Sequence, residues 1–290
     1  MFSIFAAITS TTLFAGVSIF WKRLRDKGLH TSVVLATGVI SIPLWIALGA
    51  LLWHQGYVPV LSPAYLKILV IWVTGAFLIN WLGTYLYRYR ALTELRAYEA
   101  SLAVLVGIAV DIVFFKGTTT VFEITGTVLL FISGIILTRN SAPLKNIKAL
   151  SLLKTVLPAL ALQALLFVTN IAIFKLAISY QPMPLYHSVF GETLLYSLFL
   201  ISSLKYLRSE ATAQKINAKE IAAIGLLLFF GTIFEVYMMR DFSVAFNVVL
   251  SGIPITIYSV YDFSKKTIKL SPQSILALFL IVVGLFLAKS

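Results

Sequence analysis

Residues 105–109 read LVGIA, and residues 250–254, 145 positions later, read LSGIP. The chain has 290 residues, so this offset is half of its length. Both stretches continue into apolar and aromatic residues. We therefore interpret residues 1–140 and 149–290 as two related halves joined by a loop at 141–148.

The composition places the chain in a lipid bilayer. Hydrophobic residues make up 60% of it and charged residues 12%, whereas soluble domains average about 45–50% and about 25%. A membrane-spanning helix needs about 20 predominantly apolar residues, and ten segments satisfy this. They are residues 2–21, 33–53, 68–87, 97–115, 118–138, 152–178, 184–204, 221–239, 242–261 and 270–288. Runs this long and uniform favour helices over barrel strands, so the sequence predicts an all-α, polytopic membrane protein with ten transmembrane helices.

Each half contains five of these segments. An odd number of spans per half gives the two copies opposite orientations in the membrane. The sequence thus predicts a 5+5 inverted repeat, which is the usual architecture of transporters that work by alternating access.

The net charge of +12 indicates the orientation of the chain. Most of the 23 Lys and Arg residues lie in the odd-numbered loops between predicted helices. Basic loops stay cytoplasmic, so we expect these loops inside, both termini outside, and the chain in the cytoplasmic (inner) membrane. This distribution argues against a nucleic-acid partner. The chain has no Cys, so it has no disulfide or thiol chemistry.

Short stretches carry a resemblance to a known family. They are YRAL at 89–92, ASL at 100–102, GIP at 252–254 and LSPQ at 270–273. With the predicted ten helices, they make the chain similar to the drug/metabolite transporter superfamily, of the EamA-like type. The resemblance implies that helices 1, 3, 4, 6, 8 and 9 surround a central cavity, with helices 5 and 10 behind them. Family members commonly carry Pro where this chain has Ala109, and Glu near positions that here hold Lys116 and Lys266.

Glu192 and Glu235 fall inside predicted spans, where ionisable groups are costly by about 2.5–3.5 kcal/mol or more and often functional. Glu192 stands eight residues into helix 7, close to the expected midplane. Glu235 lies in helix 8, a cavity helix according to the resemblance. Either carboxyl could hold a proton or a cation. The alternatives are a hydrogen-bonded packing role for Glu192 and an interfacial ion pair with Arg240 for Glu235.

Two further ionisable groups lie near predicted outer ends. Asp111, in helix 4, either contributes to a site or pairs with Lys116. Lys175 ends helix 6 and either reaches the interface or pairs with Glu235 or Glu192 in a gate.

Several amides and aromatic residues lie on faces that could line the cavity. Each could contact a substrate or instead bond a neighbouring helix. These candidates are Asn80, Trp81, Gln163, Asn170, Asn247 and Tyr258.

Together these features predict a secondary active transporter of a small polar metabolite, such as an amino acid or a cationic compound. The resemblance favours export, and the buried carboxyls allow proton coupling. The alternative is a flippase of a lipid-like or lipid-linked substrate on the same fold. We expect no enzyme activity, no cofactor and no metal. The expected partners are the substrate, protons and membrane lipids, and we expect a monomer, with a dimer as the alternative.

Overall fold

The protein is described by a computed structural model. It describes residues 2–29, 36–86, 99, 102–104, 106–110, 112–113, 121–140, 149–211, 217–241, 244, 247, 254–265 and 271–287. Almost all of these residues are helical, and none of them lies in a β-strand. The expectation of an all-α protein is confirmed to this extent.

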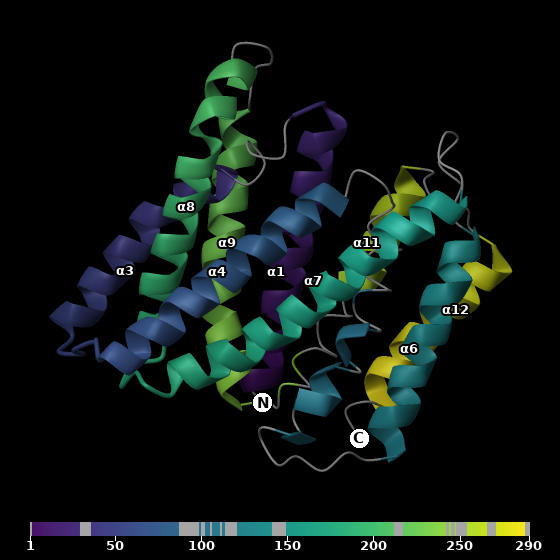
Figure 1. The fold of residues 1–290 in the computed structure, drawn as a ribbon, viewed down its shortest axis with the longest axis horizontal. Coiled ribbons are helices and arrows are strands. Elements are labelled where there is room, and N and C mark those ends of the chain that lie inside the picture. The colour runs from purple at the N-terminus through teal and green to yellow at the C-terminus, as the bar shows by residue number, and fades with distance from the viewer. Residues whose placement is uncertain are drawn as a thin grey trace. The chain divides into compact units, whose positions relative to one another are not determined.

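The helices follow one another along most of the chain (Figure 1). They are α1 Phe2–Asp26, the 3₁₀ helix η1 Thr37–Ser41, α3 Ile42–His54, α4 Pro63–Leu86, α6 Val121–Asn140, α7 Ala149–Ile178, α8 Leu185–Ala211, α9 Ala218–Asp241, α11 Pro254–Ser264 and α12 Pro272–Leu287. Each overlaps a segment expected to be a span.

Five helical segments are long and apolar enough to cross a membrane. They are Phe5–Asp26, Thr37–His54, Pro63–Leu86, Pro158–Ile178 and Ala218–Asp241, among the residues described. The protein is thus compatible with a membrane location, while the arrangement of ten spans as two inverted copies stays a prediction.

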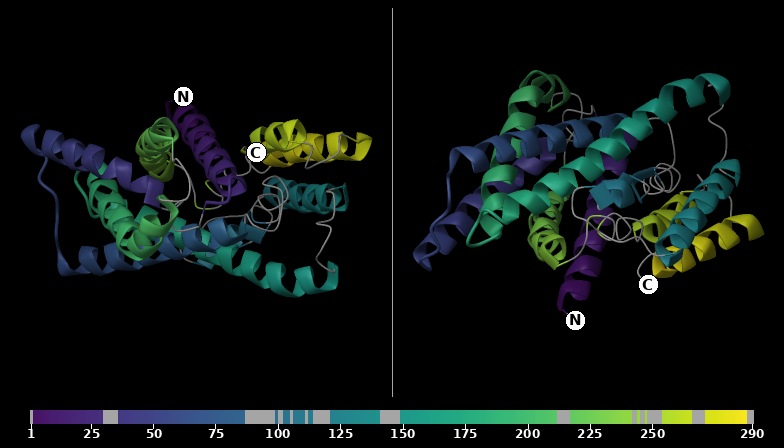
Figure 2. Two further views of the ribbon diagram at one scale, coloured as in Figure 1. Left: turned by 90° about the horizontal axis from the view of Figure 1, so that it is seen from above. Right: turned by 60° about the horizontal axis from the view of Figure 1, so that its bottom comes forward.

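The chain forms two compact units, and each draws on both predicted halves. Unit 1 comprises residues 1–84 and 170–241, and unit 2 comprises residues 85–169 and 242–290. In unit 1, α1 packs along α9, α3 packs along α8, and η1 contacts both α8 and α9. In unit 2, α6 and α12 lie side by side (Figure 2). The boundaries of the compact units therefore differ from the boundary between the two predicted sequence halves.

The first helix extends one turn beyond the apolar segment that predicted it. Lys22 and Asp26 form an ion pair one turn apart, and basic side chains near a helix C-terminus interact favourably with its dipole. The helix stops at Gly28, whose φ of 83° is left-handed. The Leu29 N–H then donates to the Leu24 carbonyl at 3.3 Å, as in a Schellman C-cap.

The second predicted span is not one continuous α-helix. It opens with the 3₁₀ helix η1, and α3 begins with Pro43 in its first turn. Proline has no N–H to donate and its ring clashes with the preceding turn, so the α-helical pattern restarts here. The Ser41 hydroxyl donates to the Gly38 carbonyl at 2.7 Å and closes the tighter turn.

In unit 2, α12 begins where the LSPQ stretch places it. The Ser271 side chain accepts from the Ser274 N–H at 3.1 Å, and Pro272 is the first helical residue. A Ser N-cap followed by Pro is a strong helix start.

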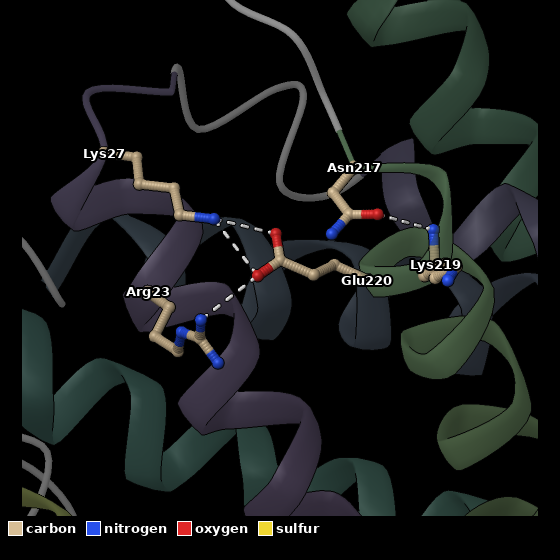
Figure 3. A network of polar contacts seen from close by, with 5 residues as sticks. All are labelled: Arg23, Lys27, Asn217, Lys219 and Glu220. Carbon is tan, nitrogen blue, oxygen red and sulfur yellow. Dashed lines mark hydrogen bonds and ion pairs between the residues drawn. The ribbon is translucent and has the colours of Figure 1, made fainter.

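Helices α1 and α9 form an antiparallel pair with polar contacts at both ends. Near one end Glu220 accepts from Lys27 at 2.9 Å and pairs with Arg23 at 3.3 Å (Figure 3). At the other end the Ser3 hydroxyl donates to Asp241. Between them the buried Ser10 hydroxyl donates to the Gly231 carbonyl at 3.0 Å. These contacts fix the register of the two helices.

We expect Glu220→Gln to lower the stability of the protein by about 1 kcal/mol, or about 2–4 °C in Tm. The Glu220 side chain is only 11% exposed and faces two cations; it also lies in the first turn of α9, where the helix dipole favours an anion. Thermal unfolding in detergent measures the effect. Asp26→Asn is the control, because Asp26 is half exposed, and it should leave Tm unchanged. Equal shifts in Tm for both variants would contradict the stabilising role assigned to the Glu220 ion pairs.

Candidate functional site

Three polar side chains form one face of α8. Ser188, Glu192 and Tyr196 are four residues apart, a spacing that stacks side chains on one side of a helix. All three are buried. The Ser188 Oγ atom has no hydrogen-bond partner among the described residues, so this face carries polar groups that packing alone does not satisfy.

A second carboxyl approaches this face from α9. Glu235 lies within electrostatic range of Glu192, and α8 and α9 are in contact in unit 1. Glu192 lies about 10 Å from the start of α8, and Glu235 lies about 9 Å from the end of α9, at about 1.5 Å per residue. The two carboxyl groups thus lie within electrostatic range of each other, about two turns inside apolar helices.

Tyr196 connects the carboxyl pair to η1. It lies within electrostatic range of both Glu192 and Glu235. Its ring packs so closely on η1 that a Cβ atom added to Gly38 would lie 2.6 Å from the ring carbon Cε1. Gly38 is therefore required for this approach. We call Glu192, Glu235, Tyr196 and Ser41 the carboxyl cluster.

Asn170 joins two helices in this structure. In the amide orientation that satisfies both groups, it donates to the Trp72 carbonyl at 2.9 Å and accepts from the Trp72 indole N–H at 3.1 Å. Trp72 also packs against Phe174, with ring centroids 5.5 Å apart. The described contacts of Asn170 correspond to the interhelical alternative, and a role in substrate binding stays a prediction.

His187 lies in an aromatic box at the start of α8. Its ring contacts the rings of Trp72 at 5.0 Å and Phe174 at 4.9 Å between centroids, and its Nδ1 atom lies 3.3 Å from the Tyr65 hydroxyl. The Nε2 atom is buried and has no hydrogen-bond partner among the described residues. The surrounding rings make this mainly a packing centre between α4, α7 and α8.

The other predicted residues of unit 1 are Asn80, Trp81 and Lys175. The Asn80 amide donates to the carbonyl of Ala76 in its own helix at 2.8 Å. Trp81 is half exposed. Lys175 is within electrostatic range of Asp241, which supports its reaching the end of the helix.

The sequence also allows Glu235 to form an ion pair with Arg240, and the structure shows which carboxylate Arg240 pairs with. Arg240 pairs with its sequence neighbour Asp241, with 2.8 Å between Nε and Oδ1. Glu235 instead lies within electrostatic range of Glu192. The described ion pair of Arg240 is therefore with Asp241, and the role of Glu235 stays a prediction.

Four predicted residues belong to unit 2, and the structure describes three of them. Gln163, Asn247 and Tyr258 are all buried there. Asp111 lies outside the described residues. A single cavity lined by residues of both predicted halves stays a prediction. Within the described part of the chain, no group of three His, Asp or Glu side chains is placed to share a metal ion.

Tyr196, Ser41 and Gly38 were not among the residues expected from the sequence. The spacing of Ser188, Glu192 and Tyr196 was a usable signal, because it marks one helix face. No comparable signal marks Ser41 or Gly38, since the sequence does not specify which helix packs against α8.

The comparisons with known proteins concern the fold alone. No family model matches the chain, and no curated protein matches it. One of 27 solved chains that match, described as "Crystal structure of protein", covers 99% of this chain and 96% of its own. The TM-score is 0.71 and the sequence identity 15%. The chain is thus similar in fold to a solved protein over nearly its whole length.

Proposed function

We propose that the protein is a secondary active transporter that exchanges protons for a small cationic or zwitterionic metabolite, such as an amine or an amino acid. The observation that carries the proposal is that Glu192 and Glu235, both on apolar helices, lie within electrostatic range of each other. The resemblance of the sequence to the drug/metabolite transporter superfamily supports it and favours export by alternating access.

The electrostatics of the cluster explain why a cation or a proton is needed. Each ionised carboxylate at membrane depth costs about 2.5–3.5 kcal/mol or more, and two within range of each other repel when both are charged. Tyr196 and Ser41, which complete the cluster, bring no positive charge. One proton or one ammonium group neutralises part of this charge, so the two compete for the same place.

This competition accounts for exchange. A bound cationic group stabilises an ionised carboxylate and displaces its proton, while a proton displaces the cation. If the cluster opens to one side of the membrane at a time, the two species move in opposite directions. A ligand with an ammonium group is the chemical class that fits this cluster.

Uptake into proteoliposomes tests the proposal. Labelled amines and amino acids are offered to vesicles that contain the purified protein, with protein-free vesicles as the control. We expect saturable uptake of at least one cationic or zwitterionic compound. A fluorescent phospholipid in the same vesicles separates the flippase alternative: dithionite bleaching beyond the outer leaflet, without uptake of any compound, would contradict transport of a small metabolite.

The proposed orientation places the loop before α9 in the cytoplasm and the loop after α3 outside. We expect a Cys at Gln55, which is exposed, to react with an impermeant maleimide in intact cells. A Cys at Ala218, also exposed, should react only after the cells are opened. The native chain supplies no competing thiol. The reverse pattern would overturn the orientation.

A further inference from the structure

Two close contacts fix how η1 and α3 lie along α8. A Cβ atom added to Gly49 would lie 2.9 Å from the Val189 side chain. One added to Gly38 would lie 2.6 Å from the Tyr196 ring. The residue numbers rise in one segment where they fall in the other, so the two segments run antiparallel. Between the two contacts, each turn of α3 therefore has a matching turn of α8.

Trp45 and Glu192 lie on matching turns of this interface. Trp45 precedes Gly49 by four residues. Glu192 follows Val189 by three residues. Both steps are one helical turn and stay on the same face of their helix. Because the helices are antiparallel, the two steps lead to the same depth, and the Trp45 turn lies opposite the Glu192 turn.

The Trp45 indole carries a buried N–H donor. The side chain is fully buried, and its ring centroid lies 4.7 Å from that of Phe229 on α9. The Nε1 atom has no hydrogen-bond partner among the described residues. An aromatic ring offers an N–H only a weak contact, and a buried donor that stays unpaired is costly.

A second unpaired group lies one turn away on α8. The Ser188 side chain is fully buried, and its Oγ atom has no hydrogen-bond partner in the part of the chain that the structure describes. Ser188 precedes Glu192 by four residues on the same helix face. Two buried donors near one carboxyl point to a ligand whose acceptor atoms complete the site.

We propose that Trp45 and Ser188 bind the acceptor end of the transported compound, and that this compound is a zwitterion with a carboxylate beside its ammonium group. The inference rests on the proposed function, in which Glu192 holds the ammonium group. An indole N–H only donates, so it pairs with a carboxylate oxygen and not with an ammonium group. Hydrogen bonds to an ionised acceptor are stronger than those to a neutral one.

This arrangement discriminates an amino acid from the amine that lacks its carboxylate. Both donors are fully buried, so a ligand reaches them only when the interface between α3 and α8 opens. A bound carboxylate then pairs with both donors, whereas a simple amine leaves them unpaired. Sites built to hydrogen-bond a polar group reject the analogue that lacks it.

Thermal unfolding in detergent tests the inference without any transport. The purified protein is titrated with the standard amino acids and with the corresponding amines that lack the carboxylate, and the rise in Tm gives each Kd. We expect at least one amino acid to bind at least about tenfold more tightly than its amine. Trp45→Phe, which keeps a ring against Phe229, should weaken binding of that amino acid at least about tenfold and change binding of the amine less than about twofold.

Trp21→Phe is the matched control. The Trp21 indole N–H donates to the Thr37 hydroxyl at 3.0 Å, so this variant should lower Tm and keep the preference for the amino acid. Without added compound, Trp45→Phe should keep the wild-type Tm, because its N–H has no described hydrogen bond to lose. Ser188→Ala is the second variant and should weaken binding of the amino acid even if Trp45→Phe folds poorly.

The outcomes separate this inference from the proposed function. Equal binding of amino acid and amine, no binding of any amino acid, or an unchanged preference in Trp45→Phe or Ser188→Ala would overturn the inference. Uptake of simple amines alone into proteoliposomes would support the proposed function and contradict the inference. A preference for the amino acid without uptake of any compound would support the inference and contradict the proposed function.

Discussion

Replacing Glu192 and Glu235 by Gln should abolish the stimulation of transport by a pH gradient, lowering gradient-driven flux at least about tenfold, which corresponds to about 1.4 kcal/mol. Gln keeps the shape and the hydrogen-bonding capacity of Glu but holds neither an exchangeable proton nor a negative charge. In the wild-type protein the two carboxyls lie within range of each other, so one residual carboxyl retains part of the function. We therefore expect each single variant to be impaired and the double variant to lose coupling.

Flux of a labelled amine or amino acid into proteoliposomes, with and without a pH gradient, measures this effect. Glu220→Gln is the matched control, because Glu220 pairs with Lys27 and Arg23 near the ends of α1 and α9. It should keep the wild-type pH dependence. If both Glu192→Gln and Glu235→Gln keep wild-type rates and pH dependence, neither carboxyl couples transport to protons, and uniport becomes the better account.

Gly191→Ala should destabilise the protein by about 1–3 kcal/mol, because it overfills a closed space. A Cβ at this position would lie 2.5 Å from Cζ3 of the Trp72 ring. That ring cannot withdraw easily, since its indole N–H is held by Asn170 and its face packs near His187. The cost of this clash exceeds the difference in helix propensity, which favours Ala over Gly by about 1 kcal/mol.

Thermal unfolding in detergent provides the measurement. Gly16→Ala is the control, since its Cβ would lie 3.3 Å from the end of the flexible Leu227 side chain, and it should be neutral or stabilising. In a Trp72→Phe background the indole ring that causes the clash is absent. Adding Gly191→Ala to that background should therefore cost little stability. An equal cost in both backgrounds would show that the Trp72 contact is not the cause.

Much of the helical structure was predictable because local chemistry determines it. Apolar runs of about 20 residues marked the helices, and the Ser271 N-cap with Pro272 marked the start of α12. The break between η1 and α3 was missed. Pro43 was visible in the sequence, but an apolar run gives no indication of a 3₁₀ turn before a proline.

The candidate site was predictable only in part. Apolar context identified Glu192 and Glu235 separately, because any charge stands out in such a chain. Their proximity depends on α8 packing against α9, which no local pattern encodes. Asn170 illustrates the opposite case: a buried amide can bind a substrate or a neighbouring helix, and only the contacts with Trp72 show which groups it reaches.

The central claim is that a cationic group and a proton compete for Glu192 and Glu235. Its most direct test is proton movement in proteoliposomes that enclose a pH-sensitive dye. On addition of a transported amine or amino acid outside, the account predicts saturable proton efflux through the wild-type protein, and none through the double Gln variant or in protein-free vesicles. Uptake of that compound by the wild-type protein with no proton movement at all would contradict it.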